Sequence, residues 1–171
     1  MTRVLHRGRA GDFQIERADL PSGRSVDLEI FRHCGASAIV PFEDDDTVLL
    51  IRQYRHAAGG FIWEVPAGKL EGDAPEICAA KELEEEVGRR PGRLEHLVTI
   101  WTTPGFTDER IHLYAAFDLE AVPQRLEEHE VIEVVPTPLS QALDMVWSGE
   151  LSDGKSALAL IHAARRLGRL S

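Results

Sequence analysis

The sequence predicts an α+β fold built on a mixed β-sheet. Stretches with the β-branched, apolar character of strands outnumber stretches with helical periodicity, and the two kinds alternate irregularly. The chain has 171 residues, of which 43% are hydrophobic and 28% charged, a composition typical of a soluble globular protein with one domain. No repeat, low-complexity tract or linker interrupts it.

The N-terminal part is predicted to form a β-hairpin. Phe13–Ala18 and Val26–His33 have strand patterns, and LPSGRS between them has Pro/Gly turn chemistry. The apolar stretches ASAIVPF and TVLLIRQYR follow as two strands, and the residues EDDD between them are predicted to form a turn. FIWEVPAG (61–68) is predicted as one further strand. HLVTIW and RIHLYAAFDL are two more, separated by TTPGFTDE.

Helices are predicted in three places. The first follows Pro75, a residue that suits the first turn of a helix, and ends at Gly88. The second covers Pro138–Ser148. The third covers Lys155–Leu167 and is closed by Gly168.

Charge and cysteine content exclude several classes of protein. The net charge of −10 argues against binding to nucleic acid, because phosphate backbones are held by clustered Lys and Arg. No stretch is long and apolar enough for a signal peptide or a membrane span. The two cysteines, Cys34 and Cys78, suggest no disulfide framework, and Cys78 is expected to be buried. We therefore expect a reduced, cytoplasmic protein.

The first predicted helix carries an unusual concentration of acidic residues. At about 100° per residue, Glu82, Glu85 and Glu86 share one face, whereas Glu84 lies away from them. A separate apolar stripe is predicted for the core, made of Ile77, Ala80, Leu83 and Val87.

This acidic face has two interpretations. One is an ordinary solvated helix face, which is common for a Glu-rich helix. The other is a cation site, because charges on a solvated helix usually alternate in sign and these do not. The preceding PAG turn could add backbone carbonyl ligands. Carboxylates at i, i+3 and i+4 suit Mg²⁺, which prefers oxygen ligands together with substrate phosphates.

The segment AGKLEGDAPEICAAKELEEEVG resembles the signature of the Nudix hydrolases. KELEEEVG matches the end of that signature, except that Lys81 stands where the family has Arg. The resemblance implies a mixed sheet between helices, with an N-terminal segment over residues 1–33 and a Nudix domain over 34–171. It also implies Mg²⁺, with Mn²⁺ as the alternative, bound by Glu82, Glu85, Glu86 and the Ala67 carbonyl. Glu85 is expected to be catalytic as well.

A second resemblance is to the ADP-ribose pyrophosphatase branch of that family. TTPGFTDERIHLYAA is similar to a segment in which Pro104, Gly105 and Phe106 would shape the ribose side of the site. IRQYRH is similar as well, and implies that Arg55 reaches a phosphate or ribose. From the residues alone, the first segment is equally a Pro-Gly turn between strands, and Arg55 is equally an exposed residue at a strand end.

The acidic segment LEEHEVIEV could be a surface loop before a strand. In the branch that it resembles, a flexible loop here carries a catalytic glutamate and a further metal ligand. The positions favour Glu128 as the base and Glu130 as the ligand, with Glu127 as the alternative base. Such a loop suits a lid that closes over substrate.

The resemblance implies hydrolysis of ADP-ribose to AMP and ribose 5-phosphate. Other segments are similar to GDP-mannose hydrolases, so a GDP-mannose or broad nucleoside-diphosphate-sugar hydrolase is the first alternative. A Nudix module that binds a nucleotide without cleaving it is a second. Phe61, Trp63 and Phe106 are candidates to stack on the base, with Trp63 favoured as a core residue. Related enzymes are dimers, so we expect a homodimer in which Phe13–His33 forms the interface.

Overall fold

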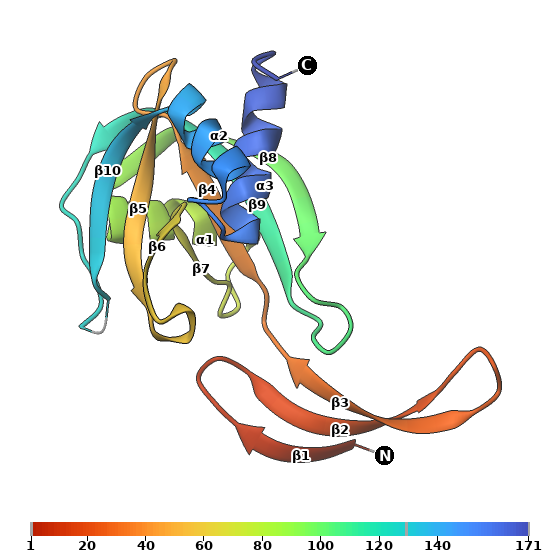
Figure 1. Cartoon of the computed structure of the whole chain (residues 1–171). Coiled ribbons are helices and arrows are strands. Elements are labelled where there is room, and N and C mark those ends of the chain that lie inside the picture. Colours follow the sequence, from red (N-terminus) through yellow and green to blue (C-terminus); the bar gives the residue numbers. More distant parts are fainter. Residues whose placement is uncertain (1, 129, 171) are drawn as a thin grey trace.

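The computed structural model describes residues 2–128 and 130–170, and it has the predicted α+β architecture (Figure 1). Three sheets are present in this part of the chain, with strand orders β1-β2-β3, β7-β4-β9-β8 and β10-β5-β6. The first sheet lies apart from the other two and from all the helices (Figure 1). His129, in the predicted acidic loop, lies outside the described residues.

The N-terminal sheet contains the predicted hairpin and one strand more. Strands β2 (Asp12–Asp19) and β3 (Ser25–Arg32) pair antiparallel, as expected. Strand β1 (Thr2–Arg7) adds to the edge of β2 and was not predicted. All residues of β1 are exposed, so its sequence lacks the alternation that marks a half-buried strand.

The central mixed sheet is organised around β4 (Ala36–Pro41), which is buried at every position. It pairs parallel with β9 (Arg110–Ala121) and antiparallel with β7 (Ala67–Lys69). Strand β8 (Arg89–Trp101) completes the sheet and is longer than the predicted HLVTIW.

The second sheet of the domain is antiparallel and was not distinguished in the sequence. It consists of β10 (Ile132–Pro138), β5 (Thr47–Arg55) and β6 (Gly60–Glu64). The prediction of one strand over 61–68 is wrong, because the chain leaves this sheet after Glu64 and enters the central sheet at Ala67. Pro66 lies at the break, where its missing N–H cannot continue a ladder.

The three predicted helices are confirmed. Helix α1 (Pro75–Glu82) continues into a π-helical turn (Leu83–Val87) that ends at Gly88, whose φ of 70° suits glycine. Helix α2 covers Leu139–Ser148, and α3 covers Gly154–Arg166.

The helices cover opposite faces of the central sheet and create two cores. Ala38 and Val40 of β4 point to the larger core, which contains the buried residues of α2 and α3. Ile39, between them, points to the smaller core, which contains Leu83 of the α1 segment. This alternation follows from the two-residue period of a strand.

The buried face of α1 differs from the predicted stripe. Leu83 and Val87 are buried as expected, but Ile77 is 58% exposed, and Cys78 and Ala79 take its place. The helix is thus turned so that its buried face extends toward the acidic side. Cys78 is buried, as predicted.

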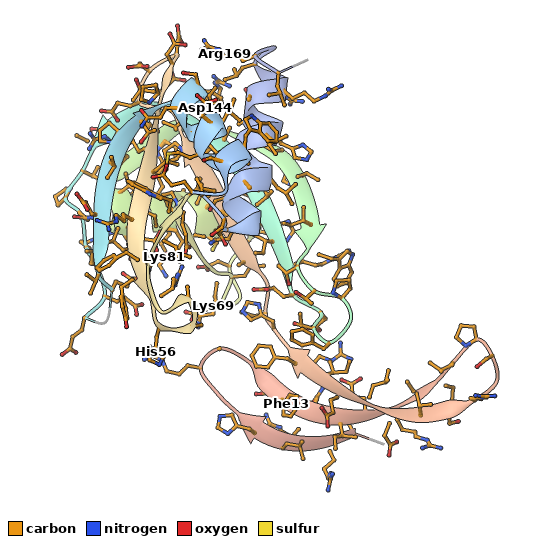
Figure 2. The ribbon with its side chains drawn as sticks, viewed as in Figure 1. Phe13, His56, Lys69, Lys81, Asp144 and Arg169 are labelled. Atoms are coloured by element: carbon orange, nitrogen blue, oxygen red, sulfur yellow. The ribbon has the colours of Figure 1, made fainter. Side chains whose placement is uncertain are left out.

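The N-terminal sheet is attached to the domain mainly through the turn between β8 and β9. The Arg32 guanidinium contacts Asp108 at 2.9 Å, and the Phe31 N–H donates to the Phe106 carbonyl at 2.7 Å. The His33 N–H donates to the Asp108 carboxylate at 2.8 Å. The end of the domain near this sheet carries Lys69 and Lys81, whereas Asp144 and Arg169 lie at the far end (Figure 2). In the described part of the chain, no helix is long and apolar enough to cross a membrane.

Replacing Ile39 by Ala tests the smaller core. Ile39 is fully buried, so the variant should lose about 2–5 kcal/mol of unfolding free energy in urea denaturation. Ile77→Ala is the matched control, because the same atoms are removed from an exposed helical position. Equal losses for both variants would contradict the core described here.

Candidate functional site

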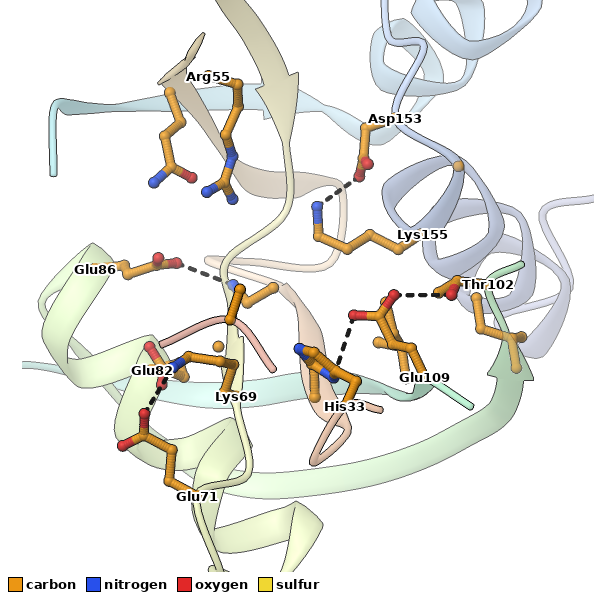
Figure 3. A pocket seen from close by; sticks show the side chains of 18 of the residues that line it. His33, Arg55, Lys69, Glu71, Glu82, Glu86, Thr102, Glu109, Asp153 and Lys155 are labelled. Atoms are coloured by element: carbon orange, nitrogen blue, oxygen red, sulfur yellow. Dashed lines mark hydrogen bonds and ion pairs between the residues drawn. The ribbon is translucent and has the colours of Figure 1, made fainter. Parts of the chain in front are cut away.

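A cavity of about 790 Å³ opens between strands β5 and β7, the start of α3, and residues 82–87 at the end of α1, which form the acidic turn. This volume suits a nucleotide-sized ligand. Glu82 and Glu86 lie on one side of the cavity, and Arg55 and Lys155 point into it from elsewhere on its wall (Figure 3).

The three predicted metal-binding glutamates, Glu82, Glu85 and Glu86, all line this cavity together with Ala67. Glu86 is only 2% exposed, and its Oε2 accepts a hydrogen bond from the Ala67 N–H at 3.0 Å. Glu84 does not line the cavity and pairs with Arg90 outside it. The structure therefore separates the carboxylates as the helical wheel predicted.

Negative charge inside the cavity is incompletely compensated. Burial raises the pKa of Glu86 from its ordinary 4.5 to about 8, and the charge of Glu82 adds to the rise. Burial likewise raises the pKa of Glu82 to about 7, with the charge of Glu85 adding to it. By contrast, the hydrogen bond from Arg90 lowers the pKa of Glu84. Raised carboxyl pKa values in a cleft are typical of a functional site.

These carboxylates suit a hard divalent cation by their chemistry, since all are oxygen donors in a region of excess negative charge. In this structure, however, they are not arranged as a complete coordination site. Among the described residues, no three His, Cys, Asp or Glu side chains stand close enough together to hold an ion as they are. Binding of a cation would therefore draw the carboxylates together.

Gly68 controls the position of one of these carboxylates. A Cβ atom at Gly68 would overlap the carboxylate of Glu82. The backbone of Gly68 does not have a positive φ, so conformation alone would admit alanine here. The glycine is therefore required by the close approach of Glu82.

The three glutamates predicted in the acidic loop do not all lie in the same place. Glu127 and Glu130 line the cavity, whereas Glu128 is exposed and does not. The Glu127 N–H donates to the Glu130 carboxylate at 2.8 Å. In this conformation, the predicted base Glu128 is therefore not with the other carboxylates.

Arg55, predicted to reach a phosphate or ribose, lines the cavity, and a buried carboxylate orients it. Its Nε and Nη2 donate to the two oxygens of Glu64 at 2.7 and 2.8 Å. Lys155 donates to Glu64 at 2.6 Å and to Asp153 at 2.8 Å. Burial alone would raise the pKa of Glu64, but Arg55 and Lys155 outweigh it, and the pKa lies below its ordinary value.

Pro104, Gly105 and Phe106 do not line the cavity within one chain. Phe106 is 53% exposed, and its carbonyl accepts the hydrogen bond from β3. The flanking residues Thr102 and Glu109 reach the cavity instead, joined by a 2.8 Å hydrogen bond. The predicted segment is thus near the site, but its neighbours provide the side chains.

Several lining residues were missed in the sequence. The signal for Lys155 was indirect: Glu64, which does not itself line the cavity, is a charge in the apolar run FIWEVP and requires a partner. His33 lies 3.5 Å from Glu109, and its Nδ1 accepts from the Gly35 N–H. Arg9 reaches the cavity from the β1–β2 turn, and its carbonyl accepts from Lys69. Nothing in the sequence of that turn indicated this contact.

Comparison with known proteins identifies the family. The model of the NUDIX domain matches residues 32–156, which is most of the chain. This chain belongs to the Nudix family. A solved structure described as ADP compounds hydrolase superposes on this Nudix protein with a TM-score of 0.84, covering 99% of this chain and 95% of that one. At 22% identity, that similarity supports the fold alone.

Relatives of this Nudix protein have different names. The ADP-ribose pyrophosphatase of Bacillus subtilis (strain 168) is 37% identical, over 91% of this chain and 86% of the relative. The methanol dehydrogenase activator of Bacillus methanolicus is 35% identical, over 93% and 88%. A GDP-mannose pyrophosphatase of Escherichia coli O1:K1 / APEC is 37% identical, over 78% and 79%.

The raised carboxyl pKa values predict how stability depends on pH in metal-free protein. The folded state binds protons more tightly than the unfolded state between about pH 4.5 and pH 8, so the unfolding free energy should fall as pH rises through this window. Urea denaturation at several pH values measures this fall, and added Mg²⁺ should reverse it at pH 8. Glu86→Gln should reduce the pH dependence, and Glu84→Gln should not. An equal pH dependence of the unfolding free energy in wild type and Glu86→Gln would contradict the raised pKa of Glu86.

Gly68→Ala should separate metal affinity from stability. The new Cβ displaces the Glu82 carboxylate, so Mg²⁺ affinity should fall roughly tenfold or more. The unfolding free energy should hold or rise slightly, because alanine loses less chain entropy on folding. Calorimetric Mg²⁺ titration and urea denaturation measure the two quantities. Gly60→Ala, where a Cβ meets no atom within 4 Å, is the control. Unchanged Mg²⁺ affinity in Gly68→Ala would refute the role assigned to the glycine.

Proposed function

We propose that this Nudix protein hydrolyses the pyrophosphate bond of ADP-ribose, giving AMP and ribose 5-phosphate. The observation that carries the proposal is one cavity lined both by three carboxylates of the acidic turn and by Arg55 and Lys155. A pyrophosphate is the ligand chemistry that uses both groups, since its charge suits the cations and its oxygens suit a metal bound by the carboxylates. The Bacillus subtilis relative supports ADP-ribose as the substrate.

The cofactor proposed is Mg²⁺, with Mn²⁺ as the alternative. Glu82, Glu85, Glu86 and the Ala67 carbonyl would hold it, and Glu130 is a further candidate ligand because it lines the same cavity. When bound, the cation neutralises phosphate charge and lowers the pKa of water. The incompletely compensated negative charge at Glu82 and Glu86 supports this assignment.

The cationic residues would bind and orient the pyrophosphate. Glu64 holds Arg55 through Nε and Nη2, which leaves the Nη1 edge of the guanidinium without a hydrogen bond among the described residues. The Lys155 ammonium uses two donors on Glu64 and Asp153. Because both cations are held in advance, little side-chain entropy is lost when the substrate binds.

Proton transfer from water is the role proposed for a glutamate of the acidic loop. Glu127 and Glu130 line the cavity and are the nearer candidates. Glu128 would have to swing inward with its loop, as in an enzyme whose lid closes over the substrate. Glu85 lines the cavity and stays a proposed catalytic residue.

A GDP-mannose or broader nucleoside-diphosphate-sugar hydrolase is the alternative, supported by the GDP-mannose pyrophosphatase relative. A module that binds without cleavage is disfavoured, because all three glutamates of the motif reach the cavity. The homodimer, the cytoplasmic location and the substrate contact of Pro104, Gly105 and Phe106 stay predictions. Phe61 and Phe106 are about half exposed and stay candidates to stack on a base, but the Phe61 ring already contacts Arg52 and neither residue lines the cavity; Trp63 packs against the larger core.

Product analysis tests the proposal directly. The protein is incubated in parallel with ADP-ribose, GDP-mannose and UDP-glucose, each with Mg²⁺ and with a chelator. We expect AMP and ribose 5-phosphate from ADP-ribose only when the metal is present. Preferential release of GMP from GDP-mannose would support the alternative, and no cleavage of any substrate would refute both.

Glu86→Gln should lower the rate about 100-fold or more, because it removes one proposed metal ligand. Glu84→Gln is the matched control, since the same change is made two residues away and outside the cavity. Full activity of Glu86→Gln would rule out the metal assignment.

A further inference from the structure

Gln53 occupies an unusual position on the wall of the cavity. It lies on β5 between Ile51 and Arg55, and the two-residue period of the strand places all three side chains on one face. Ile51 is fully buried, Gln53 is 4% exposed, and Arg55 is half-buried. Gln53 lines the cavity. It is therefore the deepest polar residue on this strand, beside the guanidinium proposed to bind phosphate.

The side-chain amide of Gln53 lacks the partners that its burial requires. Its Oε1 is the one buried side-chain polar atom without a hydrogen bond in the described residues, 2–128 and 130–170. The register of the sheet places Ile62 of β6 and Ile132 of β10 opposite Gln53, so its cross-strand neighbours are apolar. An amide in such surroundings destabilises the fold, and a methionine would avoid that cost.

A sequence keeps an unfavourable buried group most readily where the group serves binding. Oε1 is an acceptor and would stay unpaired beside an anion, so the group of Gln53 that can serve binding is its Nε2, which donates to no atom of the described chain. The unoccupied edge of Arg55, two residues along the same face, indicates an anion. An amide contributes to anion binding through its N–H₂ group.

We propose that Gln53 is a substrate-binding residue, whose Nε2 donates a hydrogen bond to the phosphate oxygens that Arg55 contacts. The inference rests on the proposed function only for the identity of the anion as a pyrophosphate. Gln53 and Arg55 would then bind one phosphate group from β5, while the carboxylates of the acidic turn lie across the cavity.

Three variants and a control test this proposal. Gln53→Met keeps the length of the side chain and removes its polar atoms, and Gln53→Leu does the same with a different shape. Gln53→Glu keeps the shape but replaces the donor by a negative charge. Gln141→Met makes the first change on an exposed position of α2. Each protein is titrated with inorganic pyrophosphate in the presence of Mg²⁺, unfolded in urea, and assayed for KM and kcat with ADP-ribose.

We expect Gln53→Met or Gln53→Leu to bind pyrophosphate about tenfold more weakly, with unfolding free energy at least equal to wild type. Gln53→Glu should bind more weakly still, and Gln141→Met should bind normally. In the assay, KM should rise more than kcat falls. A merely structural glutamine would give the opposite pattern, with lower stability and unchanged binding.

Three results would overturn the inference. They are wild-type affinity in both Gln53→Met and Gln53→Leu, retained affinity in Gln53→Glu when Met loses it, and no binding of pyrophosphate to wild type. These are distinguishable from failure of the proposed function. If wild type cleaves no substrate but the titrations follow the expected pattern, the function alone fails. If wild type cleaves ADP-ribose and KM is unchanged in Gln53→Met, the inference alone fails.

Discussion

The buried carboxylate of Glu64 is the constraint on which the site depends. At 1% exposure it cannot rely on water, so it must be neutralised by neighbouring cations. The cations that do so are Arg55 on the adjacent strand and Lys155 at the start of α3. One buried charge therefore joins a sheet to a helix and aims two positive groups into the same cavity.

The cavity-lining carboxylates of the acidic turn differ from Glu64, because neighbouring cations do not neutralise them. Glu82 and Glu86 lie in partly or fully buried positions, form no ion pair with any described residue, and repel one another. Glu84, on the same turn, is neutralised by its ion pair with Arg90. The fold thus compensates the acidic residue that faces outward and leaves uncompensated those that face the cavity. That difference distinguishes a cation site from a solvated acidic helix more clearly than the number of glutamates does.

Local patterns in the sequence were sufficient for most of the fold and for the acidic half of the site. The hairpin, the apolar strands, the three helices and the grouping of Glu82, Glu85 and Glu86 follow from periodicity and turn chemistry. The exposure of Ile77 could not be predicted, because it depends on how α1 is rotated against the sheet. The partners of Glu64 could not be read either, since Lys155 lies 91 residues away in the chain.

The break at Pro66 has a mechanical consequence. On one side of it, the Val65 N–H donates to the Ser156 hydroxyl of α3 at 2.8 Å. On the other side, the Ala67 N–H donates to Glu86. These two amides belong to a three-residue segment that crosses from one sheet to the other, so the segment is hydrogen-bonded to helix α3 at one end and to the acidic turn at the other. Three residues of backbone therefore fix how far the start of α3 lies from the carboxylate of Glu86, and with it the spacing between the two charged parts of the cavity.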